Sequence, residues 1–245
     1  MRKFTRSKRI IGAKRLTRKR EKPWAIVQYD NRDIPDKHAK LIEINKEYCK
    51  LHGYKYIFRK EHIEMSPWWI KVKICKELLE TNKYSGILWL DTDAAIFDSS
   101  ISLEKFTNNS EKHFFIGMDP LDKVFGPINA GVWMVKNTSI GNKIMKEWIS
   151  LYKKENWMKI DNAWKLEPTL SKIEKKWAGI NFEQGVFNQI LRLKYKKYIQ
   201  IYPLIILTHW KPEFKEGSFI GHFYNTVPAR YKTDYYLNRF HRVRK

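Results

Sequence analysis

Apolar positions in the first half of the chain alternate between two spacings. The runs at residues 24–29 and 86–91 are apolar except for Gln28 and Asp91, and residues 54–59 alternate like a strand. Residues 36–52 and 66–82 carry apolar side chains at helical spacing instead. Strand, helix, strand, helix, strand is the pattern of a parallel sheet covered by helices on both faces.

The first predicted helix has recognisable ends. Asp36 can cap its start, and Gly53 follows His52 as a stop. The spacing predicts that the buried face comprises Leu41, Ile44, Tyr48 and Leu51.

The second half of the chain is less regular but fits the same class. Residues 113–118 and 129–137 are predicted as strands, and 139–153 and 183–196 as helices. Residues 199–224 favour short strands and turns. Because no repeat or low-complexity linker separates the halves, we predict one α/β domain with a mostly parallel central sheet.

The formal net charge of +22 is unevenly distributed over the 245 residues. Residues 1–22 hold eleven Lys and Arg against one acid, Glu21, a net charge of +10. Such a segment attracts nucleic acids, anionic surfaces and phosphorylated small molecules. We expect a flexible basic arm at 1–22, a globular domain at 23–238 and a basic tail at 239–245.

Two cysteines, Cys49 and Cys75, both lie inside predicted helices. They predict neither a disulfide framework nor a zinc knuckle, so a reducing compartment is the simpler interpretation. No apolar run reaches the ~18 residues of a transmembrane helix. The leader also lacks the apolar core of a secretory signal.

Two carboxylates, Asp91 and Asp93, follow the apolar strand segment "GILWL". Ligands of parallel sheets bind at the carboxyl ends of strands, and alternation in extended chain sends residues i and i+2 to one side. The pair can therefore face one point, with Thr92 turned away, and hold Mg²⁺ or Mn²⁺. The alternative is an ordinary strand-end turn, where Asp is common.

Other candidate residues have ordinary readings when taken alone. His222 reads as a hydrogen-bonded histidine, and Asp30 as a turn residue after the first strand. Gly131 marks either a bulge or a close approach of backbone, and Glu183 is a first-turn acid of a helix. Lys71 is one lysine among many.

Taken together, five segments resemble glycosyltransferase family 34, the galactosyl/mannosyl/xylosyltransferases of the GT-A (Rossmann-like) fold. The resemblance spans residues 24–224, with the Asp-x-Asp motif at Asp91–Asp93. The other segments follow in the family's order: "SPWWIKVKICKELL" (66–79), "NAGVWMVKNTSIGNKIMKEW" (129–148), "FEQGVFNQIL" (182–191) and "GHF" (221–223).

The resemblance implies roles for these residues. The metal would be held by Asp91, Asp93 and His222, with Mn²⁺ favoured somewhat over Mg²⁺ because an imidazole joins the carboxylates. Gln184, Glu183 and Asn129 would lie near the reacting sugar carbon. Asp30, Lys71 and Gly131 would contact the donor, Asp30 at its nucleoside and Lys71 at its phosphate.

The implied reaction transfers a sugar from a UDP- or GDP-sugar to a hydroxyl of a glycan or other acceptor. The bond to the diphosphate breaks and leaves negative charge, which the cation and cationic side chains stabilise. The family retains the anomeric configuration, and the leaving phosphate is proposed to take the acceptor's proton.

The chain departs from the family in two ways. A basic arm stands where members usually carry a membrane anchor, so we expect a soluble enzyme of viral or bacterial origin that works in a cytoplasm. The segment after His222 lacks the expected Gly and Lys, and Lys211, Arg230 or Lys232 would have to supply the phosphate contact.

Two other functions compete with glycosyl transfer. A nucleic-acid-binding protein could use the basic arm and the aromatics of "WWIKVK" and "YKYIFRK", although these sit at core spacing. A nucleotidyltransferase would share the sheet and the acidic pair. It would want a glycine-rich loop after the first strand, and "YDNRDIPDK" has no glycine.

Overall fold

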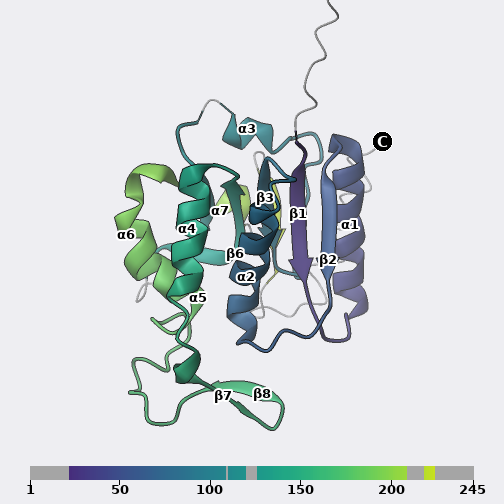
Figure 1. Cartoon of the computed structure of the whole chain (residues 1–245). Coiled ribbons are helices and arrows are strands. Elements are labelled where there is room, and N and C mark those ends of the chain that lie inside the picture. The colour runs from purple at the N-terminus through teal and green to yellow at the C-terminus, as the bar shows by residue number, and fades with distance from the viewer. Residues whose placement is uncertain (1–21, 109, 120–125, 209–217, 224–245) are drawn as a thin grey trace, which may run out of the picture.

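A six-stranded sheet forms the centre of the molecule (Figure 1). The computed structural model describes residues 22–108, 110–119, 126–208 and 218–223. The expected tail and all of the expected arm except Lys22 lie outside these residues. No helix within the described ranges is both long and apolar enough to cross a membrane.

The strand order is β2-β1-β3-β6-β5-β9. All neighbours run parallel except that β6 is antiparallel to both β3 and β5. The predicted α/β fold with a mostly parallel sheet is therefore confirmed. The sheet strands are β1 (Trp24–Tyr29), β2 (Lys55–Arg59), β3 (Gly86–Leu90), β5 (Phe114–Met118), β6 (Ile128–Lys136) and β9 (Ile199–Tyr202).

Helices pack on both faces of this sheet, because side chains of β1 and β3 alternate between two buried clusters. One face is covered by α1 (Asp36–His52), α3 (Glu104–Thr107) and α7 (Leu204–Leu207). The other face is covered by α2 (Pro67–Glu80), α4 (Ser139–Ser150) and the run α5 (Glu183–Val186), η2 (Phe187–Leu191) and α6 (Arg192–Lys194). Figure 1 shows α2 and α4 side by side in front of the sheet.

The ends of α1 follow the sequence signals closely. Gly53 adopts the left-handed conformation (φ 72°) that terminates the helix, as predicted. Pro35 is the residue that precedes the helix, and Asp36 is its first residue, so the predicted cap is wrong by one position. The predicted apolar face is wrong at Leu51, which is 63% exposed, while Tyr48 is buried.

Several short elements were not predicted. The hairpin β7 (Trp157–Ile160) and β8 (Ala163–Leu166) turns through Asp161 and Asn162, both at positive φ. Asp and Asn tolerate this conformation, and a two-residue loop of this kind is a hairpin signal. The predicted helix 183–196 contains a π-helical turn, η2. The other such elements are β4 (Ala94–Ile96), η1 (Lys154–Asn156) and η3 (Lys196–Tyr198), whereas β10 (Ile220–His222) lies within residues 199–224, where short strands were predicted.

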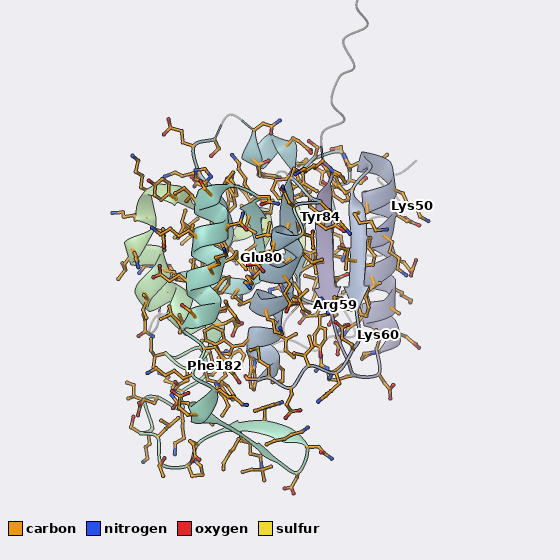
Figure 2. All side chains as sticks on the ribbon, in the orientation of Figure 1. Lys50, Arg59, Lys60, Glu80, Tyr84 and Phe182 are labelled. Atoms are coloured by element: carbon orange, nitrogen blue, oxygen red, sulfur yellow. The ribbon has the colours of Figure 1, made fainter. Side chains whose placement is uncertain are left out.

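The loops that follow the parallel strands lie at one end of the sheet. The arrow of β1 points to the lower end in Figure 1, where the hairpin β7–β8 projects. Figure 2 shows Arg59 and Lys60, at the end of β2, and Phe182, before α5, toward this same end. Tyr84, which precedes β3, lies higher in the view. The carboxyl ends of the parallel strands therefore share this end with the hairpin.

Candidate metal and donor site

The acidic pair lies in a tight turn directly after β3. The backbone N–H of Ala94 donates to the carbonyl of Asp91 over 2.9 Å, so the segment is not the extended chain that was expected. Thr92 turns away and donates its hydroxyl to Asp30. The turn, not alternation, brings Asp91 and Asp93 toward one point.

His222 joins the two acids through a second pair of strands. β10 pairs antiparallel with β4, which sets His222 opposite Ala94. The imidazole Nε2 lies 3.2 Å from Asp93 Oδ1 and 3.9 Å from Asp91 Oδ2. One ligand atom from each of these three residues lies within 4.8 Å of the other two, as a metal site requires.

Gly131 on β6 makes room for this imidazole. A Cβ at position 131 would lie 2.7 Å from Nε2 of His222 and 2.9 Å from Oδ1 of Asn129. The carbonyl of Gly131 also accepts the backbone N–H of Asp91 at 2.8 Å. The sequence left a bulge and a close approach open for Gly131, and the structure shows both: the register between β5 and β6 shifts from Trp133 to Asn129, and Gly131 lies against His222.

The buried imidazole and carboxylate shift each other's proton affinity. Burial by itself would raise the pKa of Asp93, but His222 outweighs it and lowers that pKa to about 2. Burial would lower the pKa of His222, but the charge of Asp93 raises it overall. The pair is therefore stable as an imidazolium and a carboxylate.

A buried lysine orients the first acid. Lys71 on α2 is 8% exposed, and its Nζ lies 2.8 Å from Asp91 Oδ1 and 3.4 Å from Glu183 Oε1. The indole N–H of Trp89 donates to the same Asp91 oxygen at 2.7 Å. Asp91 Oδ1 is thereby held, and Oδ2 also accepts from Lys71 at 3.1 Å and lies 3.9 Å from His222 Nε2. The expected contact of Lys71 with phosphate stays a prediction.

Lys71 lies between two carboxylates, and this determines its proton affinity. Burial opposes its charge, but Asp91 and Glu183 raise its pKa overall. Burial raises the pKa of Glu183, and the charge of Lys71 offsets only part of this increase. Lys71 is thus the cation that compensates two acids in the interior of the site.

Two amides lie beside the metal group. Gln184 accepts the backbone N–H of Ala130 at 2.9 Å, and Asn129 accepts that of Gly131 at 2.8 Å. The amide nitrogens of both side chains lie 3.4 Å from Asp119 Oδ2. Their carbonyl oxygens are held by backbone, so each amide directs its N–H groups to this carboxylate.

Sequence reasoning missed Asp119. It follows β5 as Asp91 follows β3, at the same end of the sheet. An acid immediately after the apolar run "HFFIGM" was the available signal.

Asp30, which follows β1, is buried, and both of its carboxylate oxygens accept hydrogen bonds. It accepts the Nε of Arg32 at 2.8 Å, a second guanidinium nitrogen at 2.8 Å and the Thr92 hydroxyl at 3.0 Å. Burial alone would raise its pKa, but Arg32 lowers it overall. The contact of Asp30 with a nucleoside stays a prediction.

Arg32 is the second residue that sequence reasoning missed. Its side chain is 76% exposed. The pKa of Arg32 is raised, mainly by the hydrogen bond to Asp30 and to a smaller extent by the charges of Asp93 and Asp91. Its charge is already paired with the carboxylate of Asp30. The predicted alternatives Lys211, Arg230 and Lys232 lie outside the described residues.

Comparison with known sequences supports a family assignment for part of the chain. The sequence profile of the galactosyl transferase GMA12/MNN10 family matches residues 26–113. This range begins within β1 and contains β2, β3 and the Asp-x-Asp turn, and it confirms the expected family resemblance there.

Two curated relatives are similar over 111 residues, 43% of this chain. Galactomannan galactosyltransferase 1 of Cyamopsis tetragonoloba is 26% identical, and putative glycosyltransferase 7 of Arabidopsis thaliana is 22% identical. The chain matches only 26% and 25% of their respective lengths.

A solved structure shows the same fold over most of the chain. The glycosyltransferase involved in the glycosylation of the major capsid of PBCV-1 superimposes with a TM-score of 0.62 at 16% identity. The match covers 88% of this chain and 99% of that one. The expected GT-A fold is confirmed.

Proposed function

We propose that this chain, which carries the profile of the galactosyl transferase GMA12/MNN10 family over residues 26–113, is a metal-dependent glycosyltransferase. Its donor is a UDP- or GDP-sugar, and its acceptor is a hydroxyl of a glycan or other molecule. Residues 23–238 form the catalytic domain. The observation that carries the proposal is the convergence of Asp91, Asp93 and His222 at the carboxyl end of the sheet.

The donor set fits a divalent cation that binds oxygen and nitrogen ligands. Two carboxylates and one imidazole suit Mn²⁺ somewhat better than Mg²⁺, which prefers oxygen alone. Asp91, Asp93 and His222 would hold the ion, each with an atom within 4.8 Å of the others. A bound cation stabilises the negative charge that grows on a departing diphosphate.

The chain's own residues prepare this site. Lys71 and Trp89 orient Asp91, and Gly131 allows His222 to approach.

The amides of Asn129 and Gln184 are positioned to meet the donor sugar. Both are buried, and backbone and Asp119 fix their orientation, so they need not reorganise on binding. Glu183 acts through Lys71 and positions it. Retention of configuration is part of the proposal and is supported by the family resemblance alone.

The structure lends the nucleic-acid alternative no support. In "WWIKVK", Trp69 is 0% exposed and packs in the core, so it cannot stack on a base. The basic arm lies outside the described residues, and its contact with an anionic surface stays a prediction. The cytoplasmic location expected from the sequence likewise stays a prediction.

Thermal shift with UDP or GDP, each with and without Mn²⁺, tests the function. We expect stabilisation by nucleotide only when Mn²⁺ is present. His222→Ala should abolish this dependence, whereas His113→Ala, at the amino end of β5, should keep it. A screen of sugar nucleotides for Mn²⁺-dependent hydrolysis then identifies the donor.

Two outcomes would contradict the proposal. The first is stabilisation by DNA or RNA alone, in a strongly salt-dependent way. The second is unchanged Mn²⁺ affinity in His222→Ala, which would remove His222 from the site.

A further inference from the structure

A cavity of about 550 Å³ has a lining that contains none of Asp91, Asp93 and His222. Its walls come from the residues after β1, the loop before α2 and the hairpin β7–β8. Its volume is within the roughly 300–1,000 Å³ of small-molecule sites. None of the roles assigned above uses this space.

Two half-buried tryptophans line the cavity, Trp68 at the start of α2 and Trp164 on β8. The ring of Trp68 is held by Trp157 at 5.2 Å and by edge contacts with Trp177 and Phe182 at 5.6 and 5.1 Å. Because other rings fix Trp68, its remaining surface is a rigid apolar wall. Ile63 and Met65 extend this apolar lining.

The charges at the rim are paired with acids. Arg32 lines the cavity, and its guanidinium is bonded to Asp30. Lys159 and His62 line it as well, and both reach Glu64, at 3.5 and 2.8 Å. A rim whose cations are matched by carboxylates favours a neutral ligand over a phosphorylated one.

The cavity adjoins the metal group through a short chain of contacts. Arg32 bonds to Asp30, and Asp30 accepts the hydroxyl of Thr92, which lies between Asp91 and Asp93. These contacts connect the wall of the cavity to the loop that carries Asp91 and Asp93. Asn162 offers an amide at the rim for ligand hydroxyls.

We infer that this cavity is the acceptor subsite and that Trp68 and Trp164 bind the apolar face of a neutral pyranose ring. A sugar ring combines one face of C–H groups with a rim of hydroxyls, which matches an apolar wall with a polar edge. The inference rests on the proposed function and adds the class of acceptor.

The test uses the full chain, a sugar nucleotide that the hydrolysis screen identifies, and the neutral disaccharides lactose, cellobiose and mannobiose. Trp164→Ala should raise the acceptor KM about tenfold, because the apolar contact of one ring face is lost. Hydrolysis of the donor by water and its KM should not change. Leu193→Ala is the control: Leu193 is 59% exposed and lies outside the cavity lining, so the acceptor KM should stay as in wild type.

Binding without a donor gives a second readout that does not need catalysis. Quenching of tryptophan fluorescence by a disaccharide should be seen with wild type and be reduced in Trp164→Ala. A change in donor KM alone would assign the cavity to the nucleoside and overturn the inference. Absence of disaccharide binding to wild type, with UDP and Mn²⁺ present, would overturn it too.

Failure of the proposed function gives a different pattern. In that case wild type would show neither Mn²⁺-dependent nucleotide binding nor donor hydrolysis, whatever the disaccharide does. Normal donor hydrolysis with an unchanged acceptor KM in Trp164→Ala would overturn the subsite alone.

Discussion

Gly131→Ala should damage the metal site without touching a ligand. The added methyl group would lie 2.7 Å from Nε2 of His222, with Cε1 of the same ring nearer still. Ordinary van der Waals contact begins at 3.4 Å, so Nε2 must move by at least about 0.7 Å. Metal–ligand distances tolerate only about ±0.2 Å.

The displaced imidazole has little alternative space, since His222 is 4% exposed and held 3.2 Å from Asp93. We expect Mn²⁺ affinity to fall about 10- to 100-fold, the range found when supporting groups around metal ligands are changed. Overpacking should also reduce the free energy of unfolding by about 1–3 kcal/mol. Calorimetric titration with Mn²⁺ and urea unfolding measure the two effects.

Gly86→Ala separates the metal effect from general overpacking. Its methyl group would lie 2.5 Å from the ring of Trp24 and 2.7 Å from the carbonyl of Val135, at the amino end of β3. It should lose stability but keep Mn²⁺ affinity. In a His222→Ala background, Gly131→Ala should weaken Mn²⁺ no further. An unchanged Mn²⁺ affinity in the single variant Gly131→Ala would refute the reasoning.

The remaining predictions concern protons, charge and orientation. Because the folded-state pKa of His222 is raised above 6.5 by Asp93, the stability from this pair is complete below the unfolded pKa and is lost as pH rises through the folded one. Mn²⁺ affinity should rise over that same interval, since the ion needs a neutral imidazole; a flat calorimetric pH series would contradict this. Lys71→Met should cost about 3–5 kcal/mol in urea unfolding because it leaves buried carboxylates uncompensated, and adding Glu183→Gln should recover part of the loss. If Glu183→Gln recovers none of the lost stability, the uncompensated charge of Glu183 is not the cause of the loss. Asp119→Asn should lower kcat/KM roughly tenfold through misoriented amides and leave Mn²⁺ affinity unchanged; a parallel loss of both would count against this role.

Local sequence signals determined most of the strand and helix pattern. β1 has the predicted limits, and Gly53 ends α1 in the left-handed conformation that glycine favours. These predictions succeeded because periodic burial and chain termination depend on neighbours in sequence. The hairpin at Asp161 and Asn162 had a comparable local signal and was still missed.

Side-chain partners were less accessible from sequence. Lys71 looked like one lysine among many, yet it lies buried between Asp91 and Glu183, which comes from a helix 112 residues later. Asp119 and Arg32 were missed because their significance depends on which groups face them. Burial and charge pairing are properties of packing, which spacing along the chain does not encode.

The sequence by itself determined which residue types were available for a cation: two acids after a buried strand and one late histidine. Only the tertiary structure decided that they meet, because the pairing of β10 with β4 sets His222 beside Asp93. It also decided how they meet, through a turn at Asp91 and a glycine at position 131. Contacts between residues far apart in sequence depend on strand pairing and close packing, and these exist only once the chain has folded.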